Sequence, residues 1–119
     1  MEIRRGQIWY ADLGVNVGSV QSYIRPVIII QNNIANKYSD TVTVLPITSR
    51  IRKNIPVHVD LECNRYNRLN IKSTVLNEAI DTISKEQLIR PKGIVTEEEM
   101  KKIERKLLMQ LGMMEVSNV

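Results

Sequence analysis

Residues 26–31, Pro-Val-Ile-Ile-Ile-Gln, contain the longest uninterrupted apolar run of the chain, Val27–Ile30. The run is rich in β-branched side chains and is bounded by polar residues, so it predicts a strand. Residues 7–11, Gln-Ile-Trp-Tyr-Ala, have the same character. Three further short segments predict strands: residues 41–46 and 57–61, which alternate at period two, and the shorter segment 73–76. Five short strands at this spacing favour a small barrel or sandwich.

The segment between the first two expected strands, Gly14–Ser22, is long and rich in small residues. Loops of this kind are often held out from a scaffold for binding, so we expect a functional loop here. Ser84 and Gln87 have capping-box spacing and predict a short helix to about residue 89, which Pro91 would end.

A longer helix is predicted near the C-terminus. Thr96 and Glu99 form a capping box, and acidic residues in the first turn suit the helix dipole. The helix has one apolar face, made by Met100, Ile103, Leu107, Leu111 and Met114. This face must pack on the sheet or on a partner. The basic residues on the remaining face are interpreted as a solvated surface with salt-bridge support.

The length of 119 residues, with 43% hydrophobic and 25% charged residues, is typical of one folded domain, 1–119. The longest apolar run is far shorter than the roughly 18 residues that span a bilayer, and no apolar signal segment follows the first residues. We therefore expect a soluble, cytoplasmic protein. A single cysteine, Cys63, and a single histidine, His58, exclude an internal disulfide and a multi-ligand zinc site.

The formal net charge of +4 makes a polyanionic partner plausible. The excess lies in residues 1–75, which hold ten Lys and Arg against five Asp and Glu. Many of these cations fall in two loop-like stretches, as phosphate-contacting loops would require: Arg50, Arg52, Lys53, Arg65, Arg68 and Lys72. Solvated loop charge is the alternative interpretation.

The usual catalytic residues are scarce. His58 alternates with valines and is expected on the polar side of its strand, as a surface rather than a catalytic histidine. Cys63 lacks a neighbouring histidine and is interpreted as an inert thiol. No glycine-rich phosphate loop or dinucleotide fingerprint is present. Arg25 and Thr48 remain: an arginine at a strand start suits an anion, but from the residues alone a rim cation is the favoured interpretation of Arg25, and a turn hydroxyl that of Thr48.

Four blocks of the sequence together resemble one family. They are Arg5–Leu13, Gly18-Ser19, Arg25-Pro-Val-Ile-Ile-Ile-Gln-Asn32 and Pro46-Ile-Thr-Ser49. This order, with the closing amphipathic helix, resembles the MazF/PemK toxin endoribonucleases of bacterial type II toxin-antitoxin systems. The resemblance implies a mainly β fold with short helices, a small SH3-like barrel of five to seven strands (the CcdB/PemK-like plasmid maintenance toxin fold) with a C-terminal amphipathic helix.

The same resemblance implies a homodimer that cleaves single-stranded RNA with sequence specificity and without a metal or other cofactor. It also implies inhibition by a cognate antitoxin with an acidic, disordered tail. Arg25 and Thr48 match the family's catalytic pair. In such enzymes the RNA 2′-hydroxyl attacks the adjacent phosphorus, so no protein nucleophile is needed. Arg25 would stabilise the charged phosphorane, and Thr48 would hydrogen-bond a non-bridging oxygen or the attacking hydroxyl.

The RNA-contacting positions follow from the same resemblance and from the basic loops. They are Gly18, Ser19, Asn32, Ser49, Arg50, Arg52, Lys53 and Glu78. The chain departs from many family members at Val20, Ala79 and Asp81, so the recognised RNA sequence is expected to differ from that of relatives. Two alternatives stay open: a non-catalytic toxin that binds a protein such as gyrase, and a barrel that binds nucleic acid without cleaving it.

Overall fold

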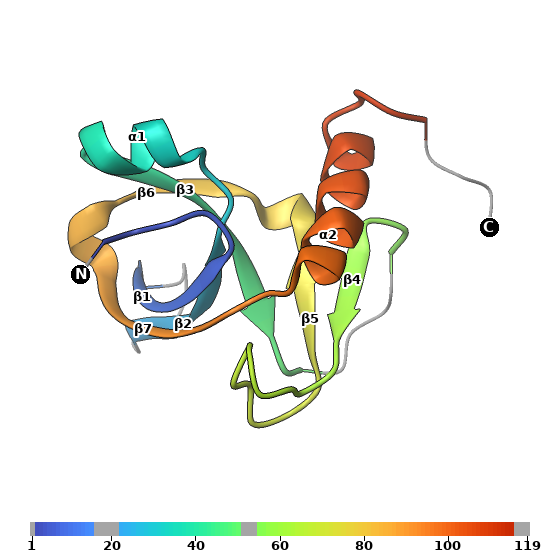
Figure 1. Ribbon diagram of the computed structural model, residues 1–119, viewed down its shortest axis with the longest axis horizontal. Coiled ribbons are helices and arrows are strands. Elements are labelled where there is room, and N and C mark those ends of the chain that lie inside the picture. The colour runs from blue at the N-terminus through green and yellow to red at the C-terminus, as the bar shows by residue number, and fades with distance from the viewer. Residues whose placement is uncertain (1, 16–21, 51–54, 116–119) are drawn as a thin grey trace.

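The computed structural model describes residues 2–15, 22–50 and 55–115 (Figure 1). Its strands are β1 (Gln7–Val15), β2 (Ser22–Ile29), β3 (Thr41–Thr48), β4 (His58–Leu61), β5 (Ser73–Leu76), β6 (Asp81–Ser84) and β7 (Leu88–Ile94). The helices are α1 (Asn33–Tyr38) and α2 (Glu97–Gln110), with the 3₁₀ turns η1 (Asn77–Ala79) and η2 (Lys85–Gln87). This confirms the expected mainly β fold with a C-terminal amphipathic helix.

Strand β3 connects the two parts of the sheet. The strand order is β4-β5-β3-β2-β1-β7, with β6 paired to β3 off this path, and every pair is antiparallel. The first half of β3 pairs β6 through Thr41–Val44, whereas its last two residues pair β5. Because one strand changes partners along its length, the sheet bends around it and wraps the interior (Figure 1).

The last part of strand β2, from Val27 onward, is buried on both faces. Ile28 and Ile30 pack into a core that also contains Ile103 of α2, whereas Val27 and Ile29 pack into a second core with Trp9. Val27, Ile28 and Ile29 have no exposed surface. A strand with a core on each side needs apolar residues at successive positions rather than at alternate ones. This explains the uninterrupted run Val27–Ile30.

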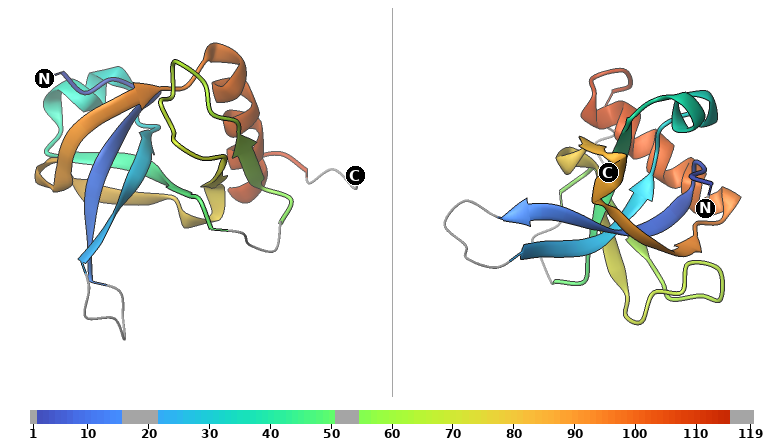
Figure 2. Two further views of the ribbon diagram at one scale, coloured as in Figure 1. Left: turned by 90° about the horizontal axis from the view of Figure 1, so that it is seen from below. Right: turned by 90° about the vertical axis from the view of Figure 1, so that its left-hand side faces the viewer.

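The hairpin of β1 and β2 is longer than the sequence indicates. Gly14 and Val15 belong to β1 and Ser22 to β2, so only residues 16–21 of the expected loop lie outside the described residues. Figure 2 shows the two strands projecting together from the body of the molecule.

The C-terminal helix begins as expected but ends early. Thr96 caps it, with its hydroxyl accepting from the Glu99 backbone N–H at 3.1 Å. Ile103 is fully buried, and Met100 and Leu107 pack against the same core. Gly112, at φ 73°, ends the helix, and this leaves Leu111 50% and Met114 40% exposed. The apolar face is therefore confirmed over its first part only.

The prediction of a helix from Ser84 to about residue 89 is wrong. The capping box does form, with the Ser84 backbone N–H donating to Gln87 Oε1 at 2.9 Å, but it opens only the turn η2. The chain then continues as β7, which contains Pro91. Among the described strands β7 pairs only with β1, so it is an edge strand in which a missing proline N–H is tolerated.

Strand β6 and helix α1 were not expected from the sequence. Asn32 caps α1 by accepting a hydrogen bond from the Ala35 backbone N–H at 2.9 Å. Within the described residues, no helix is long and apolar enough to cross a membrane.

Candidate functional site

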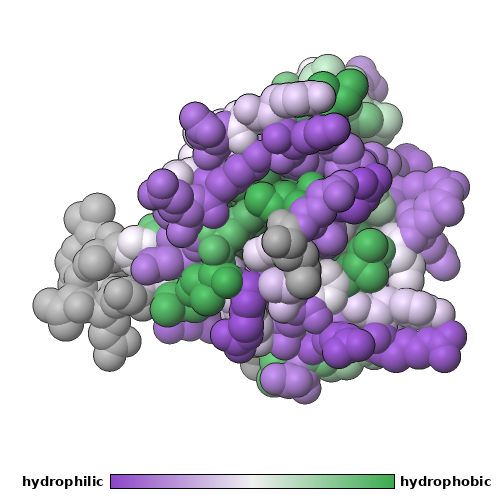
Figure 3. Space-filling view, turned by 60° about the vertical axis from the view of Figure 1, so that its left-hand side comes forward, coloured by the Kyte–Doolittle hydropathy of each residue, from purple (hydrophilic) through white to green (hydrophobic). Residues whose placement is uncertain are grey.

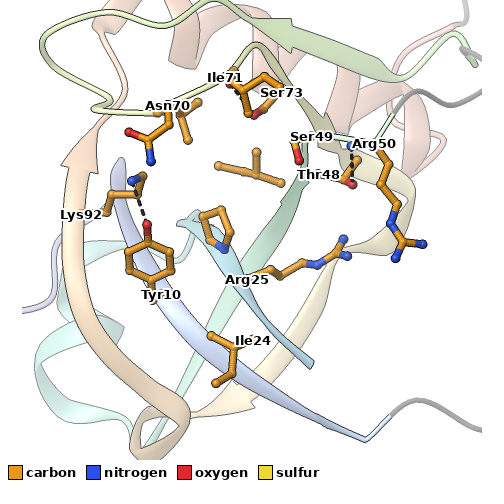
Figure 4. A pocket seen from close by; sticks show the side chains of 13 residues that line it. Tyr10, Ile24, Arg25, Thr48, Ser49, Arg50, Asn70, Ile71, Ser73 and Lys92 are labelled. Carbon is orange, nitrogen blue, oxygen red and sulfur yellow. Dashed lines mark hydrogen bonds between the residues drawn. The ribbon is translucent and has the colours of Figure 1, made fainter. Parts of the chain in front are cut away.

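A cavity of about 280 Å³ lies where several strands meet near the projecting hairpin (Figure 4). Tyr10 comes from β1, Arg25 from β2, Thr48 from β3 and Lys92 from β7. The other lining residues are Ile24, Pro26, Ile47, Ser49, Arg50, Leu69, Asn70, Ile71 and Ser73. The cavity therefore combines side chains that are far apart in the sequence.

Arg25 is half-buried in the middle of β2, opposite Ala11 of β1. Its guanidinium carbon lies 3.9 Å from the centroid of the Tyr23 ring, two residues earlier on the same strand. Stacking on an aromatic ring orients a guanidinium and directs its N–H groups outward in the plane of the group. In Figure 4 the guanidinium points toward Thr48 and Arg50.

Thr48 is the last residue of β3 and is 4% exposed. Its Oγ1 accepts a hydrogen bond from the Arg50 backbone N–H at 3.2 Å, so the interpretation as a turn hydroxyl is correct. That bond uses an oxygen lone pair and leaves the hydroxyl proton available for donation. Thr48 can therefore hold the turn and still donate to an anion in the cavity.

The structure brings together four of the residues expected at the site: Arg25, Thr48, Ser49 and Arg50. Two others do not line this cavity. Asn32 is the cap of α1, and Glu78 of η1 lies 2.8 Å from His58 Nε2. Gly18, Ser19, Arg52 and Lys53 lie outside the described residues.

His58 is not the surface residue that strand alternation predicts. Its side chain is only 5% exposed, because it is paired with Glu78 and lies next to residues of α2. Alternation identifies the two faces of a strand, but a helix packed on one face can bury a polar position there. Cys63 is exposed.

Sequence reasoning missed Tyr10, Asn70 and Lys92. Tyr10 lay in an expected strand, but nothing in its spacing marked it as a site residue. Lys92 lies in β7, whose existence the sequence did not reveal, and Asn70 lies in the segment between β4 and β5. Only the folded chain places them together.

The cavity carries positive charge. Arg25, Arg50 and Lys92 line it, and no Asp or Glu is among the described residues that do so. No group of three or more His, Cys, Asp or Glu that could hold a metal ion occurs in the described ranges. Three cations with hydroxyl donors suit an anionic group such as a phosphodiester.

The model of the PemK-like, MazF-like toxins of type II toxin-antitoxin systems matches residues 4–111. The chain belongs to this family. The match spans every residue that lines the cavity, so the cavity belongs to the part of the chain that is typical of a PemK/MazF-like toxin. The expected SH3-like barrel fold of these toxins is confirmed.

Solved structures support the same assignment. One is an endoribonuclease in complex with its cognate antitoxin, from a mycobacterial species: it is 28% identical, with a TM-score of 0.77 over 94% of this chain and 97% of that chain. The Mycobacterium tuberculosis toxin MazF-mt6 is 23% identical, with a TM-score of 0.76 over 91% and 98%. MazF from Deinococcus radiodurans is 19% identical, with a TM-score of 0.78 over 95% and 99%. The last two show that the fold is shared.

Proposed function

We propose that this PemK/MazF-like toxin is a sequence-specific endoribonuclease that cleaves single-stranded RNA without a metal ion. A cognate antitoxin would neutralise it. The observation that carries the proposal is the cavity in which Arg25, Thr48 and Arg50 meet. The mycobacterial relative at 28% identity is itself an endoribonuclease.

The proposed reaction begins with attack of the RNA 2′-oxygen on the adjacent phosphorus. The bond between phosphorus and the 5′-oxygen breaks, and the proton lost from the 2′-hydroxyl is balanced by one taken up by the leaving 5′-oxygen. The products are a 2′,3′-cyclic phosphate, which water can open to a 3′-phosphate, and a 5′-hydroxyl. Because the substrate supplies its own nucleophile, the protein needs neither a nucleophilic side chain nor a metal-bound water.

Arg25 and Thr48 are the catalytic residues of the proposal. The guanidinium stays charged at every accessible pH and offers a planar fork of donors to the phosphorane oxygens. Its position over Tyr23 limits the reorganisation needed when charge develops. Thr48 would donate its free hydroxyl proton to a non-bridging oxygen, while Arg50 would contribute positive charge at the entrance.

The antitoxin would use the same cavity. The mycobacterial endoribonuclease was solved with its cognate antitoxin. Acidic side chains on a disordered antitoxin tail would compete with RNA phosphates for Arg25, Arg50 and Lys92, which have no acidic neighbour among the described residues lining the cavity.

The test is to incubate the purified protein with a long single-stranded RNA at low salt in EDTA and to identify the ends. We expect cleavage at a limited set of sequences, with 5′-hydroxyl ends and cyclic or 3′-phosphates. RNA that is bound but intact would instead indicate the non-cleaving barrel. Cleavage that stops in EDTA and returns with a divalent ion would overturn the metal-independent mechanism.

The gyrase-directed alternative gains less support. The mycobacterial relative is an endoribonuclease, and a protein that acted only by binding another protein would not need the Arg25 and Thr48 pair.

A further inference from the structure

The segment between β4 and β5 forms one wall of the cavity. Hydrogen bonds within the segment hold its backbone in place. Asn67 is fully buried; its amide donates to the Glu62 carbonyl at 2.8 Å and its Oδ1 accepts from the Leu69 N–H at 3.0 Å. Asn64 Oδ1 accepts from the N–H groups of Tyr66 and Asn67 at 2.9 and 2.8 Å. The side chains of these two asparagines therefore fix the conformation of the backbone just before the residues that line the cavity.

The same segment is fastened to β7. The Ile94 N–H donates to the Tyr66 carbonyl at 2.9 Å. Gly93 allows this close approach, since a Cβ there would lie 2.6 Å from the Tyr66 oxygen and closer still to that of Asn67. The segment therefore places Asn70 beside Lys92, the neighbour of Gly93. Figure 4 shows both side chains, with Tyr10, on the side of the cavity away from Arg25 and Arg50.

Tyr10 holds the ammonium group of Lys92 in place. Lys92 Nζ donates to Tyr10 Oη at 2.8 Å and lies 5.0 Å from the centroid of the Tyr10 ring. No carboxylate forms a salt bridge with Lys92 in the part of the chain that the structure describes. An ammonium has three N–H donors, and Tyr10 takes one of them, so the others are available to a ligand.

This end of the cavity differs chemically from the end that holds Arg25. The end that holds Arg25 has two guanidinium groups and two hydroxyls, whereas Tyr10, Asn70 and Lys92 lie at the other end, and the apolar side chains of Ile24, Pro26, Leu69 and Ile71 complete the lining. An aromatic ring with neighbouring apolar side chains and a few fixed polar groups suits a nucleobase better than a second phosphate. On the face shown in Figure 3, apolar side chains form separate patches among hydrophilic ones.

We propose that Tyr10, Asn70 and Lys92 form a nucleobase subsite beside the scissile phosphate, and that Lys92 makes it prefer guanine or uracil to adenine. This rests on the endoribonuclease function proposed above and names a specificity determinant for it. Guanine and uracil present carbonyl oxygens that accept from an ammonium. Adenine accepts only at its ring nitrogens, and where guanine carries a carbonyl it carries an exocyclic amine, a donor that cannot pair with an ammonium. The Asn70 amide can donate or accept, so Lys92 is the discriminating group.

The test compares cleavage-site profiles on a random-sequence RNA pool, read by sequencing the 5′-hydroxyl ends. For the wild type we expect guanine or uracil to be enriched over adenine at one position next to the cut. Lys92→Met keeps much of the aliphatic length and removes the donors, so it should reduce discrimination against adenine at that position by about ten- to a hundredfold. Tyr10→Phe, which frees Lys92 from its anchor, should give a smaller change at the same position.

Arg90→Met is the matched control. Arg90 lies on the same strand and its guanidinium is 4.3 Å from the Tyr10 ring centroid, but it does not line the cavity. Its profile should equal that of the wild type. If Lys92→Met lowers cleavage equally at all sites and keeps the profile, Lys92 contacts a phosphate and the base subsite is wrong, while the endoribonuclease function stands.

Binding to uncleavable oligonucleotides separates the two proposals. Uracil and adenine decamers with 2′-deoxyribose should bind the wild type with a preference for uracil that Lys92→Met abolishes. If the wild type leaves all RNA intact but this preference and its abolition are observed, the nuclease fails and the base subsite holds. Equal affinity of the wild type for both decamers would overturn the subsite.

Discussion

Arg25 is the residue on which the proposed chemistry depends most. Arg25→Ala should lower the cleavage rate by about a hundred- to a thousandfold, the effect of removing one preorganised donor to a developing negative charge. Arg25→Lys should recover little, because an ammonium cannot reproduce the two-pronged donation of the guanidinium. The measurement is single-turnover cleavage of one RNA at saturating protein, with circular dichroism to verify the fold.

His58→Ala provides the control for Arg25. The side chain of His58 is buried and does not line the cavity, so its replacement should affect stability rather than turnover. Removal of its hydrogen bond to Glu78 should cost about 1–3 kcal/mol. If the folded His58→Ala protein is inactive while Arg25→Ala cleaves normally, the catalytic assignment is wrong.

Thr48 allows a near-isosteric test. Thr48→Val keeps the shape and deletes the hydroxyl, which removes the proposed donor and the acceptor for the Arg50 N–H. Turnover should fall with RNA affinity nearly retained. Thr74→Val, at the position paired with Thr48 on β5, is the control, since Thr74 does not line the cavity and bonds Asp60 instead. Equal rates for both variants and the wild type would remove Thr48 from the mechanism.

Among the elements, the contact between β7 and the segment before β5 is the most sensitive to side-chain size. Gly93→Ala introduces a methyl group where the carbonyl groups of Tyr66 and Asn67 already lie. The backbone must shift, and this should lower the free energy of unfolding by about 1–3 kcal/mol. Denaturant unfolding of Gly93→Ala measures this, with Arg90→Ala on the same strand expected near wild type. An unchanged midpoint would mean that the wall is not rigid.

At the scale of the molecule, two exposed features favour association with a second copy. Strand β4 ends the sheet order and has only β5 as a partner among the described strands, while the end of α2 exposes Leu111, Met113 and Met114. Open strand edges and exposed apolar side chains are both surfaces that association can cover, so we predict a homodimer. Sedimentation at micromolar concentration should give about twice 13.7 kDa. A monomer there would contradict the dimer but not the nuclease.

Three basic residues, one of which lines the cavity, predict how the affinity for RNA depends on salt concentration. Arg50 lines the cavity, and Arg52 and Lys53 follow it in the chain. Replacing all three by Ser should reduce the slope of log affinity against log salt by roughly 0.7 for each phosphate of a single strand that the protein no longer neutralises. Titrations of a noncleavable RNA at several salt concentrations measure this. A slope equal to that of the wild type would show that these residues are solvated charge.

The sequence by itself determined the features that depend on near neighbours. The β-branched run Val27–Ile30 predicts a strand from local propensity, and the Thr96 capping box predicts where α2 begins because both partners lie within one turn. The motif blocks around Arg25 and Thr48 identified the family and singled out the residues that the cavity joins.

Only the tertiary structure decided the rest, because it depends on what lies across space. Pro91 stands in a strand since β7 pairs with one neighbour only among the described strands, and His58 is buried since Glu78 pairs with it and α2 lies next to it. Lys92 and Asn70 reach one end of the cavity because a glycine lets two segments touch. Each of these features follows from a contact between distant parts of the chain. A local sequence pattern does not indicate which distant residues will be in contact.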